Sequence, residues 1–318
     1  TDHGVFRSNG KDISQWTRIS WNRPGLPIVK GKPFRGQANI IGVSDDEKYV
    51  YQVLRMRNYG INNLKIMQSI DQGNTWKDIT KRFGKGDEIS INQYVQQIMF
   101  DPRNSKRQWF LFWKTLFYSI DGGKTFKEKK FNRQVLRSAG SNAMAYDPVH
   151  GVLYLSQIVK VLRSFDFGET WETLKIKPCA NVGGVGVLDN GDLVLGMRGA
   201  LVVIPYEKIS SGKIEPEMVR MTLGEKTDDF AMNRFDFRGI YCKGKYIIAS
   251  TFATSRGSCN SARKLGLLFS NDRGKTFKWI SYNLPWNGIG SIDMRNGRII
   301  LGAKTLYTTT LDKFMKGD

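Results

Sequence analysis

The sequence predicts an all-β fold built from six similar four-stranded antiparallel units. Three observations lead to this prediction: an eight-residue pattern recurs along the chain, short apolar runs separate its copies, and the composition is rich in turn residues. The 318 residues include 33 glycines but only 9 prolines, and the mean hydropathy is −0.39. Short strands joined by glycine-containing turns are typical of all-β architectures.

The recurring pattern is Ser-x-Asp-x-Gly-x-Thr followed by an aromatic residue. Its copies are found at residues 69–76, 119–126, 164–171 and 270–277. Successive aspartates of the pattern are separated by 50, 45 and 106 residues, and the last separation is close to two periods. A near-constant period of this size indicates that each repeat is one supersecondary unit.

The pattern predicts a tight turn between two strands. An aspartate side chain accepts hydrogen bonds from the backbone N–H groups of its own turn. Glycine adopts a backbone conformation that other residues resist, and the serine or threonine hydroxyl ties the ends of the turn together. The final aromatic residue begins the next strand and packs between neighbouring units.

These segments resemble the Asp-box, or bacterial neuraminidase (BNR) repeat, of the sialidase and sortilin-like superfamily. The resemblance implies a single six-bladed β-propeller domain over residues 1–318, in which each box joins the third and fourth strands of a blade. It also implies that the box aspartates lie on the rim, away from the ligand-binding face, as structural residues. These aspartates are Asp71, Asp121, Asp166 and Asp272.

The remaining strands fall into register with the repeat. We predict innermost strands at 39–43, 96–100, 143–146, 184–188, 239–241 and 290–294. Second strands are expected at 49–57, 109–113, 152–156, 193–198, 246–251 and 298–303. Third strands are expected at 64–70, 116–120, 161–165, 201–205, 266–270 and 306–310, and outer strands at 76–80, 126–131, 171–176, 218–223 and 277–281.

That series lacks an outer strand for the sixth unit. Residues 16–22 resemble residues 277–283, so we expect the N-terminal strand to complete the last blade and close the ring. Ring closure leaves only short, protected strand edges. A third-strand pattern at residues 5–8 keeps a seven-blade count open. The unit that contains residues 184–205 has no box and carries residues 206–221 instead.

The chain is strongly basic, with a formal net charge of +20 and a pI near 9.8. Such an excess attracts anionic partners and speeds their encounter. Acidic glycans, acidic protein surfaces, nucleic acids and anionic membrane surfaces all qualify. The lysines and arginines are scattered along the chain rather than gathered in a tail, which is also the pattern of a well-solvated basic surface.

The rarer residues do not indicate a metal, a cofactor or a disulfide framework. Cys179, Cys242 and Cys259 have no metal-ligand spacing, and His3 and His150 are too few for a histidine-rich site. No apolar stretch reaches the roughly 18 residues needed to cross a bilayer. The first residues show no basic segment followed by an apolar one, so no signal peptide is visible.

In a propeller, the loops that enter the innermost strands and those that join the second and third strands form the usual ligand-binding face. Guanidinium groups bind carboxylate, sulfate and phosphate bidentately, so arginines in these loops predict an anionic ligand. The alternative is a chance distribution of arginine in a basic protein. The candidate ligand-binding residues are Arg35, Arg57, Arg198, Arg234, Arg256 and Arg263.

The resemblance to sialidases extends to little of their chemistry. Sialidases carry Phe/Tyr-Arg-Ile-Pro at the first inner strand, where this chain has Phe34-Arg35-Gly36-Gln37, and Arg57 falls at the place of their second arginine. Residues 57–63, which would supply the acid/base, contain no carboxylate. A tyrosine nucleophile also needs an activating base, and the sequence fixes none. We assign no catalytic residue.

These observations predict a non-enzymatic binding or structural propeller that recognises an acidic glycan or an acidic protein surface. A component of a phage or viral particle, or of another surface assembly with other subunits as partners, suits the charge, and a virion or extracellular location is favoured. One alternative is a sialidase-type glycoside hydrolase with a degenerate active site. Another is a nucleic-acid binder, which needs exposed aromatic residues among its basic groups.

Overall fold

The computed structural model describes most of the chain. The described residues are 6–8, 15–19, 23–29, 31–33, 37–55, 63–84, 89–90, 95–132, 142–157, 160–174, 176, 182–197, 200–211, 235–253, 267–280, 291–295, 298–302 and 306–316. They belong to two compact units, Thr1–Asn132 and Arg133–Asp318, which are described separately below.

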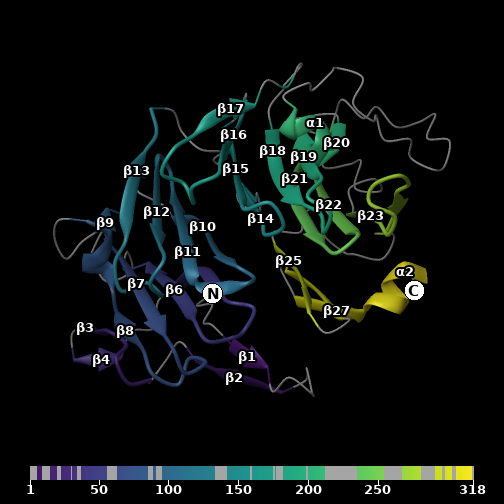
Figure 1. Cartoon of the computed structure of the whole chain (residues 1–318). Helices are drawn as coiled ribbons and strands as arrows, with labels where there is room; N and C mark the ends of the chain where they lie inside the picture. Colours follow the sequence, from purple (N-terminus) through teal and green to yellow (C-terminus); the bar gives the residue numbers. More distant parts are fainter. Residues whose placement is uncertain are drawn as a thin grey trace. The chain divides into compact units, whose positions relative to one another are not determined.

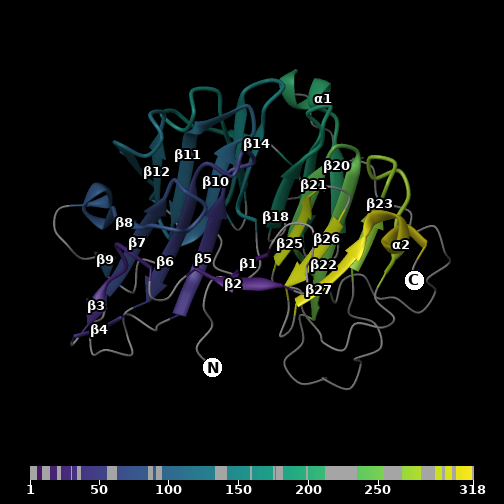
Figure 2. The same ribbon diagram turned by 90° about the horizontal axis from the view of Figure 1, so that it is seen from below.

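The first unit contains two antiparallel sheets that pack face to face (Figures 1 and 2). Apart from β9, strands that follow one another in sequence are hydrogen-bonded neighbours in each of these sheets. The first sheet has β5 (Gln37–Val43), β6 (Val50–Arg55), β7 (Asn63–Ser69) and β8 (Lys77–Asp78), and β9 (Ile89–Ser90) also pairs with β7. The second has β10 (Val95–Asp101), β11 (Asn104–Phe112), β12 (Thr115–Ser119) and β13 (Lys127–Lys130). A short 3-10 helix, Thr80–Phe83, follows β8.

Two small hairpins precede the first sheet: β1 (Phe6–Ser8) with β2 (Trp16–Arg18), and β3 (Ile28–Val29) with β4 (Lys32–Pro33). Ile19, directly after β2, belongs to a core cluster with Val50, Leu54, Met67 and Trp76, on the face of the first sheet opposite the second sheet. The Trp76 indole N–H donates to the Ile19 carbonyl at 3.0 Å. The segment around β2 is therefore anchored on the first repeat turn.

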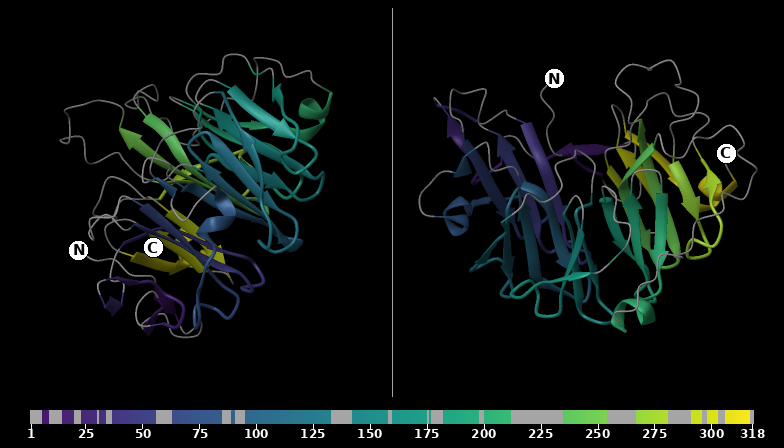
Figure 3. Two further views of the ribbon diagram at one scale, coloured as in Figure 1. Left: turned by 90° about the vertical axis from the view of Figure 1, so that its left-hand side faces the viewer. Right: turned by 90° about the horizontal axis from the view of Figure 1, so that it is seen from above.

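The second unit contains four further sheets, seen from two sides in Figure 3. The first is β14 (Met144–Asp147), β15 (Val152–Gln157), β16 (Lys160–Ser164) and β17 (Glu172–Leu174). Next are β18 (Val182–Val187), β19 (Leu193–Met197) and β20 (Ala200–Ile204), followed by α1 (Tyr206–Ser210). The last two are β21 (Phe235–Lys243), β22 (Tyr246–Ala253), β23 (Leu267–Ser270) and β24 (Lys278–Trp279), then β25 (Ser291–Arg295), β26 (Arg298–Gly302) and β27 (Leu306–Thr310), with α2 (Leu311–Lys316) at the end.

Successive sheets bury apolar side chains against one another, which explains why the second strands are apolar on both faces. Successive residues of a strand point to opposite faces. In β19, Leu193 and Leu195 pack in one cluster with Tyr154 of β15, whereas Val194 packs in another with Ile247 of β22. All five residues of β19 are buried, as are all six of β15. Such strands appear in the sequence as continuous apolar runs.

The innermost strands of successive sheets approach closely within each unit. A Cβ at Gly42 of β5 would lie 2.4 Å from Ile98 of β10, so only glycine fits there without rearrangement. In the second unit, the Val185 amide of β18 donates to the Asn142 carbonyl at 2.8 Å, and the Asn142 side chain donates to the Ile240 carbonyl of β21 at 2.5 Å. These bonds link the innermost strands β18 and β21 to the residue two positions before the innermost strand β14.

The described strands match the predicted ones to within a few residues. All eighteen predicted innermost, second and third strands correspond to β-strands in six sheets of three or more strands. Four of the outer strands are also present, and the fifth, at 218–223, lies outside the described residues. The N-terminal strand β2 pairs with β1, and its predicted role as the outer strand of the last blade remains a prediction. Whether the six sheets close into one ring depends on how the two units are placed, and the units are described separately here. The six-blade count therefore remains a prediction.

Candidate functional site: the repeat turns and the polar network beside them

The four repeat turns share one hydrogen-bond arrangement. In the turn of the second sheet, the Ser119 hydroxyl donates to Asp121 Oδ1 at 2.7 Å and accepts from the Gly123 amide at 2.8 Å. Thr125 donates its amide to Asp121 Oδ1 at 3.0 Å and its hydroxyl to Oδ2 at 2.7 Å. The same contacts recur around Asp71 with Ser69, Gly73 and Thr75, around Asp166 with Ser164, Gly168 and Thr170, and around Asp272 with Ser270, Gly274 and Thr276.

These contacts shift the protonation of the turn carboxylates. Burial by itself raises the pKa of each carboxyl, but hydrogen bonds from the threonine and serine hydroxyls and from backbone amides more than reverse this effect. The pKa of Asp71, Asp121 and Asp166 is therefore lowered to about 2, and that of Asp272 is also lowered. A carboxyl with such a pKa is a poor general acid or base at neutral pH. Each of these aspartates is hydrogen-bonded within its own turn, and its purely structural role remains a prediction.

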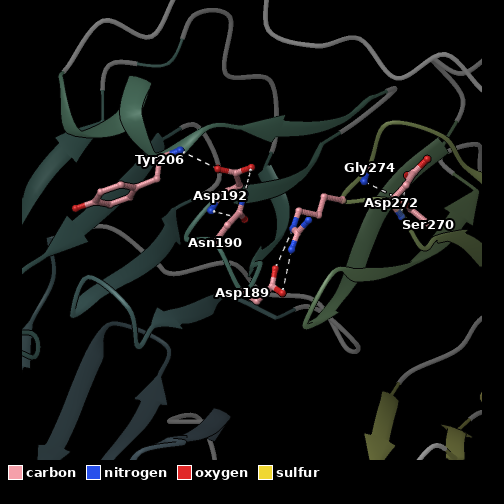
Figure 4. A network of polar contacts seen from close by, with 8 residues as sticks. Asp189, Asn190, Asp192, Tyr206, Ser270, Asp272 and Gly274 are labelled. Carbon is pink, nitrogen blue, oxygen red and sulfur yellow. Dashed lines mark hydrogen bonds and ion pairs between the residues drawn. The ribbon is translucent and has the colours of Figure 1, made fainter.

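The sheet β18–β20 has α1 where its neighbours have a repeat turn. The first residue of α1, Tyr206, donates its amide to Asp192 Oδ1 at 3.0 Å, and Asn190 donates its side-chain amide to Asp192 Oδ2 at 2.8 Å. Figure 4 shows these residues beside the repeat turn of the next sheet. In this sheet the carboxylate that accepts a backbone amide at this position is therefore Asp192, from the hairpin between β18 and β19, rather than the aspartate of a repeat turn.

Arg273 connects that hairpin to the neighbouring repeat turn. It lies between Asp272 and Gly274, and its guanidinium contacts both carboxylate oxygens of Asp189 at 3.0 and 3.2 Å (Figure 4). The pair is exposed, with 45% and 44% of the two side chains accessible. Solvent screens an exposed pair of this kind, so it orients the turn more than it stabilises the fold.

A second contact joins the β14–β15 hairpin to α1. His150 Nδ1 lies 2.6 Å from Oδ2 of Asp147, whose side chain is fully buried. The imidazole ring stacks on the Tyr206 ring, with centroids 3.4 Å apart and planes inclined by 9°. The other oxygen of Asp147 accepts from the Val149 amide at 2.8 Å. A buried carboxylate therefore fixes His150, and His150 in turn supports α1.

We expect His150→Ala to lower the free energy of unfolding by about 1–2 kcal/mol, because it removes the ring stack and one bond to a buried carboxylate. Asp189→Ala is the matched comparison, since it also removes an inter-sheet contact, but an exposed one, and should cost about 0.5 kcal/mol. Urea unfolding at pH 7 measures both. Equal losses in the two variants would show that the stack on Tyr206 does not stabilise the unit.

All six candidate ligand-binding arginines lie outside the described residues. They are Arg35, Arg57, Arg198, Arg234, Arg256 and Arg263, and their role remains a prediction. The loops that carry them are also largely outside the described part.

Sequence reasoning missed the hairpin carboxylates Asp101 and Asp147. Both follow an aromatic residue and precede a proline, and both are almost fully buried. Each accepts the backbone amide two residues on, from Arg103 at 2.9 Å and from Val149 at 2.8 Å. The repeated aromatic-Asp-Pro triplet was the available signal, because an aspartate before a turn commonly bonds the backbone in this way.

Within the described ranges, no three histidine, cysteine or carboxylate side chains come together as a metal site would require. No helix in that part of the chain is long and apolar enough to cross a membrane.

Comparison of the sequence with protein-family models and with curated proteins finds no match. Several solved structures are similar in fold. A GH74 enzyme from Niastella koreensis aligns with a TM-score of 0.63 at 16% identity, covering 96% of this chain and 49% of its own. A structure of YCF48 bound to D1 peptide aligns with a TM-score of 0.51 at 14% identity, covering 92% and 82%. YCF48 from Cyanidioschyzon merolae gives 0.55 at 13% identity, covering 88% and 84%.

The fold is that of a β-propeller. This confirms the predicted architecture of antiparallel sheets at the level of fold. The chain spans about half the length of the GH74 enzyme that it matches. At these identities the likeness concerns the fold alone, so the specific resemblance to Asp-box sialidases remains a prediction.

Proposed function

We propose that this propeller is a non-enzymatic binding protein whose partner is an acidic protein surface. The observation that carries the proposal is the charge of both units. Thr1–Asn132 contains 23 basic and 12 acidic residues, and Arg133–Asp318 contains 26 and 17. Because the excess is not confined to one segment, an anionic partner is attracted to either unit.

The contacts of seven described carboxylates favour binding over glycoside hydrolysis. Hydrolysis by the usual route needs two carboxyl groups facing the scissile bond. Here the four turn aspartates are bonded within their turns, and Asp101 and Asp147 are buried in hairpins. Asp189 is paired with Arg273. None of these seven carboxylates is available as one of such a pair.

We assign the contacts with the partner to the six candidate arginines, because guanidinium groups bind carboxylates bidentately. A protein partner is preferred to a glycan because one propeller of similar fold, YCF48, has been solved bound to D1 peptide. The basic charge also suits a subunit of a larger assembly, such as a phage or viral particle, in which acidic neighbours hold it in place.

The test is fluorescence anisotropy with a labelled 20-residue peptide rich in glutamate and aspartate. Replacing all six candidate arginines by glutamine should weaken binding at least about tenfold. The matched control replaces six exposed lysines by glutamine, gives the same net charge and should change affinity less than about threefold. These lysines are Lys77, Lys106, Lys208, Lys243, Lys275 and Lys278. Equal losses in both variants would overturn the assignment to the arginines.

Assays with a panel of fluorogenic glycosides, sialosides included, distinguish a binding protein from a glycoside hydrolase. Turnover by the wild-type protein that is lost in Arg35→Ala and in Arg57→Ala would replace the binding proposal by a sialidase-type reaction. The binding proposal requires no turnover on any of these substrates.

A further inference from the structure

The third repeat turn, residues 164–171, differs from the other three in its charge and in its aromatic content. Its sixth position is Glu169, whereas the second and fourth turns have Lys124 and Lys275 there. The residue directly after it is Glu172, whereas a lysine follows each of the other three turns. Its second position is Phe165, where the other turns have isoleucine or asparagine. All these positions are exposed, so the third turn presents a different surface.

The part of the chain around this turn does not share the basic excess. Residues 142–211 include the sheets β14–β17 and β18–β20 together with α1, and they contain 6 basic and 7 acidic residues. Their net charge is therefore −1 in a chain whose net charge is +20. A cationic partner that is repelled by most of the protein can approach this part, because salt screens charges that lie more than about 10 Å away.

The β14–β15 hairpin and the third turn lie at the same end of their sheet, because the strands are antiparallel. Helix α1 lies along that end. Its Tyr206 ring stacks on His150 of the hairpin, and its Ile209 carbonyl accepts a hydrogen bond at 2.6 Å from the Arg163 guanidinium of β16. Side chains from the hairpin, the turn and α1 therefore form one surface. We call it the α1 patch, and its members are Val149, His150, Phe165, Glu172, Tyr206 and Glu207.

The α1 patch exposes apolar side chains. Phe165 is 54% exposed and Val149 is 47% exposed, and exposed apolar groups that gather in one place mark interaction sites. The Arg163 guanidinium lies 5.2 Å from the centroid of the Phe165 ring, and Glu172 balances its charge at 2.5 Å. This contact is within the range of about 6 Å for cation–π attraction. The ring therefore already binds one guanidinium, and its exposed part can bind another.

Negative charge in and beside the patch exceeds positive charge. Asp166 of the third turn is ionised at neutral pH: burial raises its pKa, but hydrogen bonds within the turn lower it to about 2. Asp192 accepts the Tyr206 amide (Figure 4), and Glu207 is exposed on α1. Within the described part of the chain, none of these three carboxylates is in an ion pair, and α1 has one lysine, Lys208. The charge of the patch thus suits a cation.

We propose that the α1 patch docks an arginine-rich polypeptide segment of a partner protein. The carboxylates of the patch complement the cationic side chains, and such complementarity gives specificity. The exposed ring of Phe165 suits arginine in particular, because guanidinium groups are attracted to aromatic faces. This partner is opposite in charge to the acidic one that we assigned to the candidate arginines. The two partners therefore bind different surfaces, and this inference does not rest on the proposed function.

The experiment measures binding of a labelled peptide of alternating arginine and serine to the whole chain by fluorescence anisotropy at low salt. The third-turn variant is Phe165→Asn, Glu169→Lys, Glu172→Lys. It introduces the residues that the fourth turn has at these positions, so the turn itself should be retained. We expect this variant to bind the peptide at least about tenfold more weakly, because it removes the exposed ring and reverses two charges.

The matched control is Ile120→Asn, Asp45→Lys, Glu128→Lys. It replaces the exposed side chain at the same position of the second turn and makes the same change in net charge at exposed residues of the first unit. Its affinity should change less than about threefold. Equal losses in the two variants would overturn the proposal, because net charge rather than the patch would then attract the peptide. If the third-turn variant does not fold, Phe165→Asn alone should bind at least about threefold more weakly than Ile120→Asn alone.

Two further probes test the chemistry and the class of the partner. The same peptide with citrulline in place of arginine keeps the shape of the side chain but not its charge, and it should bind at least about tenfold more weakly. Sedimentation velocity of the wild type at increasing concentration tests whether a second copy of this chain is the partner, and we expect no self-association through the patch. Absence of binding of the arginine peptide, equal binding of the citrulline peptide, or self-association that is lost in the third-turn variant would each overturn the proposal.

Discussion

Gly123→Ala should lower the free energy of unfolding by about 3 kcal/mol, one of the two largest effects expected in this chain. Gly123 has a φ of +78°, and an added Cβ would lie 2.5 Å from the hydroxyl oxygen of Tyr51. That hydroxyl donates to Gln108 and accepts from Gln68 at 2.6 Å, and all three side chains are buried. The methyl group must therefore disturb a buried polar network between the two sheets of the first unit.

The control for Gly123→Ala is Gly31→Ala. Gly31 has a similar φ of +73°, but among the described residues outside its chain neighbours no atom lies within 4 Å of the position of its Cβ. Gly31→Ala should lose only about 1 kcal/mol of unfolding free energy, because it strains the backbone alone. The additional loss of about 2 kcal/mol in Gly123→Ala then measures the effect of the methyl group on packing. Thermal unfolding should show a fall in Tm of about 6–12 °C for Gly123→Ala. Equal shifts in both variants would mean that the Tyr51 network tolerates the methyl group.

Asp121→Ala is the second change with a large expected effect, about 2–3 kcal/mol of unfolding free energy. The substitution removes an acceptor of four hydrogen bonds, including those from the Thr125 amide and hydroxyl. Asp121→Asn retains one oxygen and should lose about half as much. The control is Asp45→Ala in an exposed hairpin, which should lie within about 0.5 kcal/mol of the wild type. Urea unfolding at pH 7 measures all three.

The repeat turns also predict acid sensitivity. The pKa of Asp71, Asp121 and Asp166 is about 2 in the folded protein against 3.8 for an ordinary aspartate. A carboxyl whose pKa is lowered by folding contributes its full stability above the unfolded pKa and loses it as the pH falls through the folded value. Stability should therefore be constant from this source above about pH 5 and decline toward pH 2. The difference in the free energy of unfolding between the wild type and Asp121→Ala should therefore become smaller as the pH falls from about 5 toward 2. Urea unfolding at pH 7, 5, 3.5 and 2.5 measures this difference.

The sequence was sufficient for the elements that depend on local chemistry. The Ser-x-Asp-x-Gly-x-Thr pattern predicted the four turns because each turn is closed by its own side chains, as the contacts of Asp121 with Ser119 and Thr125 illustrate. The second strands were predicted from continuous apolar runs because both of their faces are covered, as in β15. The turn recurs in four of the six sheets and the apolar second strand in all six, so the register of one repeat predicts that of the next.

The tertiary structure alone decided contacts between residues that are far apart in sequence. Whether His150 meets Tyr206, or Arg273 meets Asp189, depends on how one sheet is placed against the next, and no short pattern encodes that placement. The pairing of β1 with β2 is a further case, because the sequence of Trp16–Arg18 suits an outer strand wherever its partner lies. Local hydrogen bonds within a turn depend on a few neighbouring residues, whereas packing between sheets depends on the whole chain. For this protein the sequence determined the repeat and its strands, and the tertiary structure determined which side chains join one sheet to the next.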